Sequence, residues 1–78
     1  MQYNNFGKFI RSKRESLQPR VSLNAFAINN DIEPAILSRI ETQQQDIKLK
    51  ILAKIANGFK LKISELLNEY EKQEKDFL

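Results

Sequence analysis

The chain has 78 residues, which is room for one small domain with a single hydrophobic core. It contains no cysteine and no histidine, so disulfide bonds, thiolate chemistry, most zinc sites and the commonest general base are excluded. The net charge of +3 is mildly basic and points only weakly to a polyanionic partner.

The distribution of this charge is more informative than its sum. The charged residues of 8–20 are basic apart from Glu15, and residues 48–62 carry lysines and no acidic residue. Residues 65–76 are predominantly acidic. One end of the molecule therefore suits a polyanion better than the other end does.

Composition also bounds the fold class and the compartment. Two glycines and two prolines are too few for an all-β fold with many tight turns, so an all-α domain is favoured. No apolar run approaches the ~20 residues that a membrane helix needs, and the N-terminus does not resemble a signal peptide. We therefore expect a cytoplasmic protein with no membrane partner.

Apolar spacing predicts five helices, the first over about residues 3–17. Pro19 ends this helix, because the residue before a proline avoids helical backbone angles. The inward positions follow the i, i+3, i+4 rhythm of one helix face. They are Phe6, Phe9, Ile10, the stem of Lys13, and Leu17.

Two short helices follow, over about residues 23–29 and 33–41. Ser22 is a suitable cap for the first of them. Asn30 and Asp31 supply the turn between the two helices, since both tolerate left-handed backbone geometry. The inward positions are Phe26 and Ala27 in the first helix and Leu37 and Ile40 in the second.

A polar loop over residues 42–46 leads to a fourth helix over about residues 48–57. Gly58 lies at the end of that helix and suits a left-handed cap. Ser64 is the expected cap of a fifth helix that frays towards Leu78. The inward residues of this half are Leu52, Ile55, Ala56, Phe59, Leu61, Leu66, Leu67 and Tyr70.

The segment 22–41 is thus two short helices joined by a tight turn, the unit that places a recognition helix in the major groove of DNA. Such helices also occur in any small bundle, so their spacing alone leaves DNA binding open. The individual residues are more specific. They form an ordered set: Phe26-Ala27 in the first helix, Asp31-Ile32 at the turn and Leu37-Ser38-Arg39-Ile40-Glu41 in the second.

With these residues, the stretch SLNAFAINNDIEPAILSRIE resembles the phage-repressor-like helix-turn-helix family, also called the Xre or lambda-repressor-like family. The likeness extends over about residues 6–67. It implies a five-helix domain that regulates transcription, most simply as a repressor, by binding double-stranded operator DNA as a homodimer. It further implies a bacterial or phage origin and association with the nucleoid when bound to DNA.

The resemblance carries two sets of DNA-facing residues onto this chain. The base-facing candidates are Glu33, Pro34, Ala35, Ser38 and Arg39. The phosphate-facing candidates are Ser22, Leu23, Asn24, Thr42, Gln43, Gln44 and Gln45, and Lys48 is placed with them because it can also line the DNA backbone.

Arg39 is the strongest of these candidates. Its planar guanidinium can bind guanine O6 and N7 together, which discriminates against a wrong base by ~1–3 kcal/mol. A phosphate is an equally good target, and a solvated helix arginine is the alternative. Glu33 can accept from cytosine N4 or match the helix dipole, and Ala35 can touch a thymine methyl group or simply favour helix.

The chain departs from the family pattern at several of these positions. Leu23 stands where many members carry a DNA-contacting glutamine, and Asp31 and Gln43 stand where glycine is usual. We therefore expect phosphate contacts, which position a protein without specifying sequence, to carry most of the affinity. By resemblance, Arg14 and Glu41 form a partly buried ion pair with a structural role.

Two other interpretations are open. One is a protein-interaction module on the same fold, such as the antitoxin half of a toxin–antitoxin pair. The amphipathic tail would then bind the partner through Leu66, Leu67, Tyr70, Phe77 and Leu78. The other is an enzyme, but no nucleophile–base set, metal cluster or phosphate loop is recognisable, so we expect neither catalysis nor a cofactor.

Overall fold

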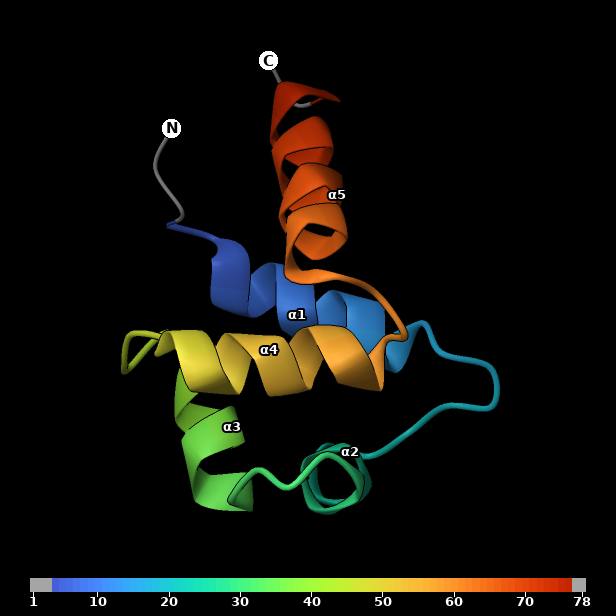
Figure 1. Ribbon diagram of the computed structural model, residues 1–78, viewed down its shortest axis with the longest axis vertical. Helices are drawn as coiled ribbons and strands as arrows, with labels where there is room; N and C mark the ends of the chain where they lie inside the picture. The colour runs from blue at the N-terminus through green and yellow to red at the C-terminus, as the bar shows by residue number, and fades with distance from the viewer. Residues whose placement is uncertain (1–3, 77–78) are drawn as a thin grey trace.

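Five α-helices and no strand make up the part of the chain that the computed structural model describes, residues 4–76. The helices are α1 (Phe6–Glu15), α2 (Leu23–Asn29), α3 (Pro34–Glu41), α4 (Leu49–Gly58) and α5 (Ile63–Asp76). In Figure 1, α1 and α4 run across the molecule, α2 and α3 lie below α4, and α5 stands above them. The predicted all-α class with five helices is confirmed.

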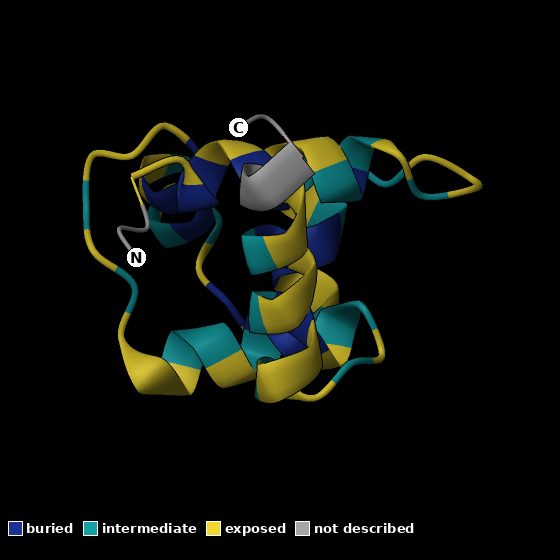
Figure 2. Cartoon of the chain, turned by 90° about the horizontal axis from the view of Figure 1, so that it is seen from above, coloured by how far each residue is buried: buried dark blue, intermediate teal, exposed yellow. Residues whose placement is uncertain are grey.

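One hydrophobic core joins all five helices, and Figure 2 shows its buried residues where the helices face one another. Tyr70 of α5 packs edge-on against Phe6 and Phe9 of α1, with ring centroids 5.2 and 5.4 Å away. Its hydroxyl also accepts a hydrogen bond from the backbone N–H of Asn5 at 3.3 Å. These contacts fix α5 to the start of α1, as such edge-to-face aromatic packing commonly does in cores.

The positions predicted to face inward are for the most part buried. Ile10, Leu37, Ile55 and Leu66 have no exposed surface, whereas Leu17, Leu52, Phe59, Leu61 and Leu67 pack half-buried at the edge of the core. Leu66 and Tyr70 are therefore covered by their own domain and do not form a tail surface for a partner. Phe77 and Leu78 lie outside the described residues.

Three helices end in the same hydrogen-bonded motif, in which a left-handed residue follows the last turn. The left-handed residues are Asp31 after α2 (φ 58°), Gln43 after α3 (φ 63°) and Lys60 after α4 (φ 60°). After α2, for example, Ile32 N–H donates to Ala27 O at 2.8 Å and Asp31 N–H to Ile28 O at 3.3 Å. Asp31 and Gln43 thus adopt the conformation for which glycine is usual at their positions.

The left-handed cap predicted at Gly58 is wrong, because Gly58 is the last residue of α4 and the left-handed residue is Lys60. Gly58 instead provides space. A Cβ atom there would lie 2.6 Å from Phe26 Cζ and 2.7 Å from Asn30 Nδ2, so α4 could not approach the end of α2 as closely.

The predicted helix bounds need small corrections. The first helix spans Phe6–Glu15, because Asn4 and Asn5 form a turn before it, and α4 spans Leu49–Gly58. Tyr3 lies outside the described residues. Ser22 caps α2 as predicted, its hydroxyl oxygen accepting from Ala25 N–H at 3.1 Å. Ser64 does not cap α5, because it lies inside the first turn.

The start of α5 is capped by a carboxylate. The backbone N–H of Lys62 donates to Glu65 Oε1 at 2.8 Å, so this side chain reaches back from the first turn. None of the helices among residues 4–76 is both long and apolar enough to cross a membrane.

A buried ion pair joins α1 to the end of α3. Arg14 Nε and Nη2 donate to the two carboxylate oxygens of Glu41 at 2.8 and 2.9 Å, and Arg14 Nη1 donates to Val21 O at 2.9 Å. The side chains are only 7% and 2% exposed, so the predicted pair is confirmed and is fully buried. The hydrogen bond with Glu41 raises the pKa of Arg14 despite the opposing effect of burial, and the charges of Glu41 and Glu15 add to the rise.

Candidate nucleic-acid interface

The two faces of α3 have different environments. Leu37, Ile40 and Glu41 are buried against the rest of the domain, so α3 is held by that face. The opposite face carries residues at i, i+3, i+4 and i+7: Ala35, Ser38, Arg39 and Thr42. Ser38 is half-buried and the other three are exposed, which leaves a continuous stripe of the helix open to a partner.

Arg39 is oriented by a neighbouring side chain. Its Nε donates to Gln45 Oε1 at 2.8 Å, and no other side chain within residues 4–76 hydrogen-bonds to its guanidinium. A guanidinium has five N–H donors in a fixed plane, so the terminal nitrogens keep their donors for an acceptor outside the chain. Gln45 was predicted as a phosphate contact, and the structure adds this orienting role.

Two hydroxyl groups of the candidate set are already engaged, but in different ways. Thr42 Oγ1 donates to Ser38 O at 2.8 Å, so while this bond is formed its proton is not available to a phosphate. Ser22 Oγ accepts from Ala25 N–H and keeps its own proton for donation. Ser22 therefore fits the predicted phosphate-facing role better than Thr42 does.

The loop after α3 presents uncharged amide groups. Gln43 and Gln44 are exposed, and Gln43 Oε1 accepts from the backbone N–H of Lys8 at 3.4 Å. Since that bond uses the oxygen of the amide, the NH₂ group of Gln43 remains a donor. Lys48 is exposed directly before α4 and adds a positive charge to the same segment.

The remaining candidates fall into two groups. Asn24, Glu33 and Ala35 are exposed, as a binding role requires. Leu23 is half-buried and packs against the core, and Pro34 is half-buried in the first turn of α3. Leu23 is therefore better placed as a packing residue than as a phosphate contact. Among the described residues, no hydrogen bond joins Ser22 or Asn24 to the group of Arg39, Thr42 and Gln45.

Two of the basic residues have partners within the domain. Lys54 bonds Asp31 O at 2.8 Å and pairs with its carboxylate at 3.3 Å, so it holds the α2–α3 turn. Lys13 pairs with Glu69 and lies 5.3 Å from the Phe59 ring centroid. These two cations serve the fold.

Lys8 is a residue that the sequence did not single out. It is exposed and touches the loop after α3 through Gln43. The basic segment 8–20 was the available signal, but the contact joins residues far apart in the chain. No described residue forms an ion pair with Lys8, Lys48 or Lys50, so these charges remain for an anionic partner.

Comparison of the chain with protein-family models, with curated proteins and with solved structures gives no match. Within residues 4–76, no group of acidic side chains is arranged to hold a metal ion. Three features of the described residues are open to a partner: the exposed stripe of α3, the amides of the following loop and the unpaired lysines Lys8, Lys48 and Lys50.

Proposed function

We propose that this protein is a sequence-specific double-stranded-DNA-binding regulator of the phage-repressor-like, lambda-repressor-like kind, with α2 and α3 as its helix-turn-helix. In this proposal α3 enters the major groove. The observation that carries it is the outer face of α3. There, exposed Arg39 is pre-oriented by Gln45, and the small residues Ala35 and Ser38 allow close approach to the bases.

The surroundings of α3 support the same proposal. Lys8, Lys48 and the amide groups of Gln43 and Gln44 lie at or beside the end of α3, where they can contact phosphates and fix the helix in the groove. Repression is the simplest output, because a small domain that occupies an operator excludes other proteins from it. Homodimeric binding to a two-fold site is part of the proposal.

Salt dependence of binding tests this proposal. We expect the affinity of the chain for duplex DNA, measured by fluorescence anisotropy, to fall linearly with salt on logarithmic axes, with a slope of ~0.9 per phosphate contacted. The variant Lys48→Ala should weaken binding to all sequences alike and lower that slope by ~0.9.

A matched control is available at the other end of α4. Lys62 is also exposed but lies on the α4–α5 turn, away from the loop that follows α3 (Figure 1). Lys62→Ala removes the same charge, and we expect it to leave the slope almost unchanged. Equal effects of the two variants, or binding that does not depend on salt, would contradict the proposed interface.

A further inference from the structure

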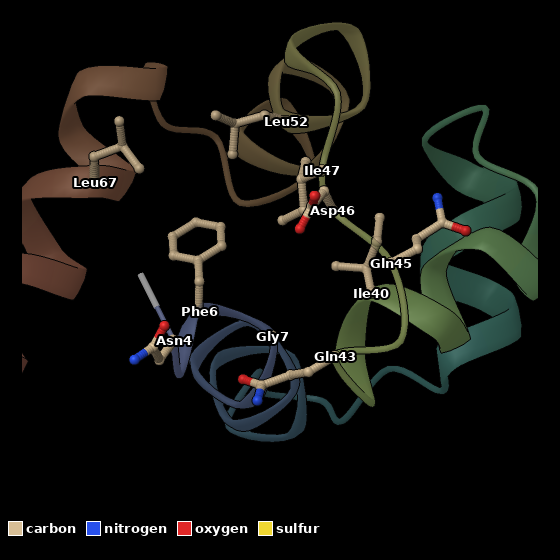
Figure 3. A pocket seen from close by; sticks show the side chains of 10 residues that line it. All are labelled: Asn4, Phe6, Gly7, Ile40, Gln43, Gln45, Asp46, Ile47, Leu52 and Leu67. Atoms are coloured by element: carbon tan, nitrogen blue, oxygen red, sulfur yellow. The ribbon is translucent and has the colours of Figure 1, made fainter. Parts of the chain in front are cut away.

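A hollow lies between the start of α1, the end of α3, the following loop, α4 and α5 (Figure 3). Its volume is about 560 Å³, within the range of roughly 300–1,000 Å³ that is usual for small-molecule sites. Its lining includes Phe6, Gln43, Gln45, Asp46, Leu52 and Leu67.

The lining combines apolar walls with a single charge. Phe6, Leu52 and Leu67 come from three different helices and surround the hollow (Figure 3). Asp46 is the one charged residue of the lining, and no described side chain pairs with its carboxylate. No lysine or arginine within residues 4–76 lines the hollow.

We propose that this hollow binds a small organic cation, with its ammonium group on Asp46 and its apolar body against Phe6, Leu52 and Leu67. The charge decides the class of ligand. An anion would be repelled by the Asp46 carboxylate with no basic residue in the lining to offset it, and a neutral ligand would gain no ion pair with this exposed carboxylate. An apolar body gains free energy by leaving water for the walls.

The same hollow touches the proposed DNA interface, and this second step rests on the proposed function. Gln43 and Gln45 line the hollow and also belong to the loop that faces DNA. Gln45 in addition orients Arg39 through the 2.8 Å bond to Nε. An ammonium group has three donors, so while bound to Asp46 it can also donate to the amide oxygen of Gln45 in the same lining. It would then compete with Arg39 Nε for that oxygen and release Arg39, so the bound cation should weaken DNA binding.

The test of the site uses three probes with one apolar body: phenylpropylamine, phenylpropanol and phenylpropanoate. Each is titrated into the isotope-labelled full chain, and backbone amide shifts are followed by NMR. The amine should shift the amides of Asp46, Ile47 and Leu67 and bind at least tenfold more tightly than the alcohol, which is about 1.4 kcal/mol. The carboxylate should not bind.

Two variants separate the role of Asp46 from a general effect of charge. Asp46→Asn should abolish the preference for the amine over the alcohol. Asp31→Asn removes another exposed carboxylate, outside the hollow, and should keep that preference. Equal binding of the three probes, shifts located elsewhere, or an unchanged preference in Asp46→Asn would overturn the site.

The regulatory step has its own readout. Saturating phenylpropylamine should lower the affinity for duplex DNA at least fivefold, near the lower end of usual allosteric coupling. Methylammonium at the same concentration, the control for ionic strength, should not, and the effect should vanish in Asp46→Asn. Binding of the amine without any change in DNA affinity would overturn the regulation alone. A chain that bound the amine but no DNA would overturn the proposed function and leave the site standing.

Discussion

Arg14 and Arg39 contact partners on or just after the same helix, α3, yet the two guanidinium groups serve different ends. Arg14 meets a carboxylate, Glu41, through two hydrogen bonds in an environment that excludes water. Arg39 meets a neutral amide, Gln45, through one hydrogen bond on the exposed face. Each guanidinium nitrogen of the first arginine has a hydrogen-bond partner inside the domain, whereas the terminal nitrogens of the second keep their donors for a partner outside it.

Because of this difference, the inner face of α3 stabilises the fold and the outer face remains open for binding. Because a buried charge that loses its partner carries the full cost of its desolvation, the inner face of α3 tolerates little change. The outer face contributes almost nothing to packing, since Ala35, Arg39 and Thr42 are exposed. Substitutions on the two faces should therefore change two different measurements.

The largest expected effect is on stability. Arg14→Met leaves Glu41 buried and unpaired, and we expect the free energy of unfolding to fall by about 3–5 kcal/mol. Chemical denaturation of the two proteins measures it. Arg11→Met removes an arginine from the same helix whose pair with Glu15 is at the surface, at 3.4 Å. That control should change stability by less than about 0.5 kcal/mol, and equal losses would show that burial of the pair is unimportant.

The pH dependence of this effect follows from the raised pKa of Arg14. A group whose pKa is raised by folding contributes stability that is fully present below its unfolded pKa and is lost only as the pH rises through the folded pKa. For an arginine both values lie far above neutrality. The difference in stability between the native chain and a variant that removes both partners, Arg14→Met with Glu41→Leu, should thus stay constant from neutral to moderately alkaline pH, and a decline over that range would contradict this account of the pair.

The next effect is on DNA binding. Arg39→Ala should weaken binding to the preferred site by about tenfold and relax the preference at one base pair, because a bidentate contact with guanine is worth ~1–3 kcal/mol. Stability should hardly change. Gln45→Ala should weaken binding in the same direction but less, since the guanidinium remains and only its orientation is lost. Arg39→Ala with unchanged affinity and preference would refute the role of α3.

The smallest expected effect is at Gln43, which follows α3 with a left-handed backbone angle and also belongs to the loop of the proposed DNA interface. A left-handed backbone angle costs a residue with a Cβ atom about 1–2 kcal/mol, and glycine avoids that cost. The greater conformational entropy that glycine loses on folding offsets about 0.5–1 kcal/mol of the resulting stabilisation. Gln43→Gly should therefore raise the free energy of unfolding by about 0.5–1 kcal/mol while weakening DNA binding. Lys60→Gly, at the equivalent position after α4, should stabilise equally with a smaller effect on binding. We expect Gln43→Gly to raise stability and clearly lower the affinity for DNA, whereas Lys60→Gly should raise stability with a smaller loss of affinity.

The buried faces of the helices could be predicted because apolar periodicity reports directly on burial. Ile10, Ile40 and Ile55 show this, and the Arg14–Glu41 pair followed from resemblance. The ends of the helices were harder to predict, because a glycine there can supply either a left-handed backbone angle or space for a neighbouring side chain. Gly58 was expected to supply a left-handed angle, but it supplies space beside Phe26 and Asn30, a contact between α4 and the end of α2 that local spacing does not reveal.

At the candidate site, too, some features could be predicted from the sequence and others could not. The exposure of Arg39 could be inferred from its position on α3, since it lies opposite the inward Leu37 and Ile40. Its bond to Gln45 could not be inferred, and neither could the contact of Lys8 with Gln43. Both depend on how the loop after α3 turns back over the domain, which is set by the left-handed angle of Gln43 and by the approach of α1.

The most direct test of the claim that the outer face of α3 reads DNA is selection of binding sites from a pool of random duplexes. The native chain and Arg39→Ala are compared at a low and a high salt concentration. We expect the native chain to enrich a two-fold-symmetric site that is lost at high salt, and Arg39→Ala to lose the preference at one base pair of each half-site. No enrichment by the native chain at either salt concentration would contradict the account.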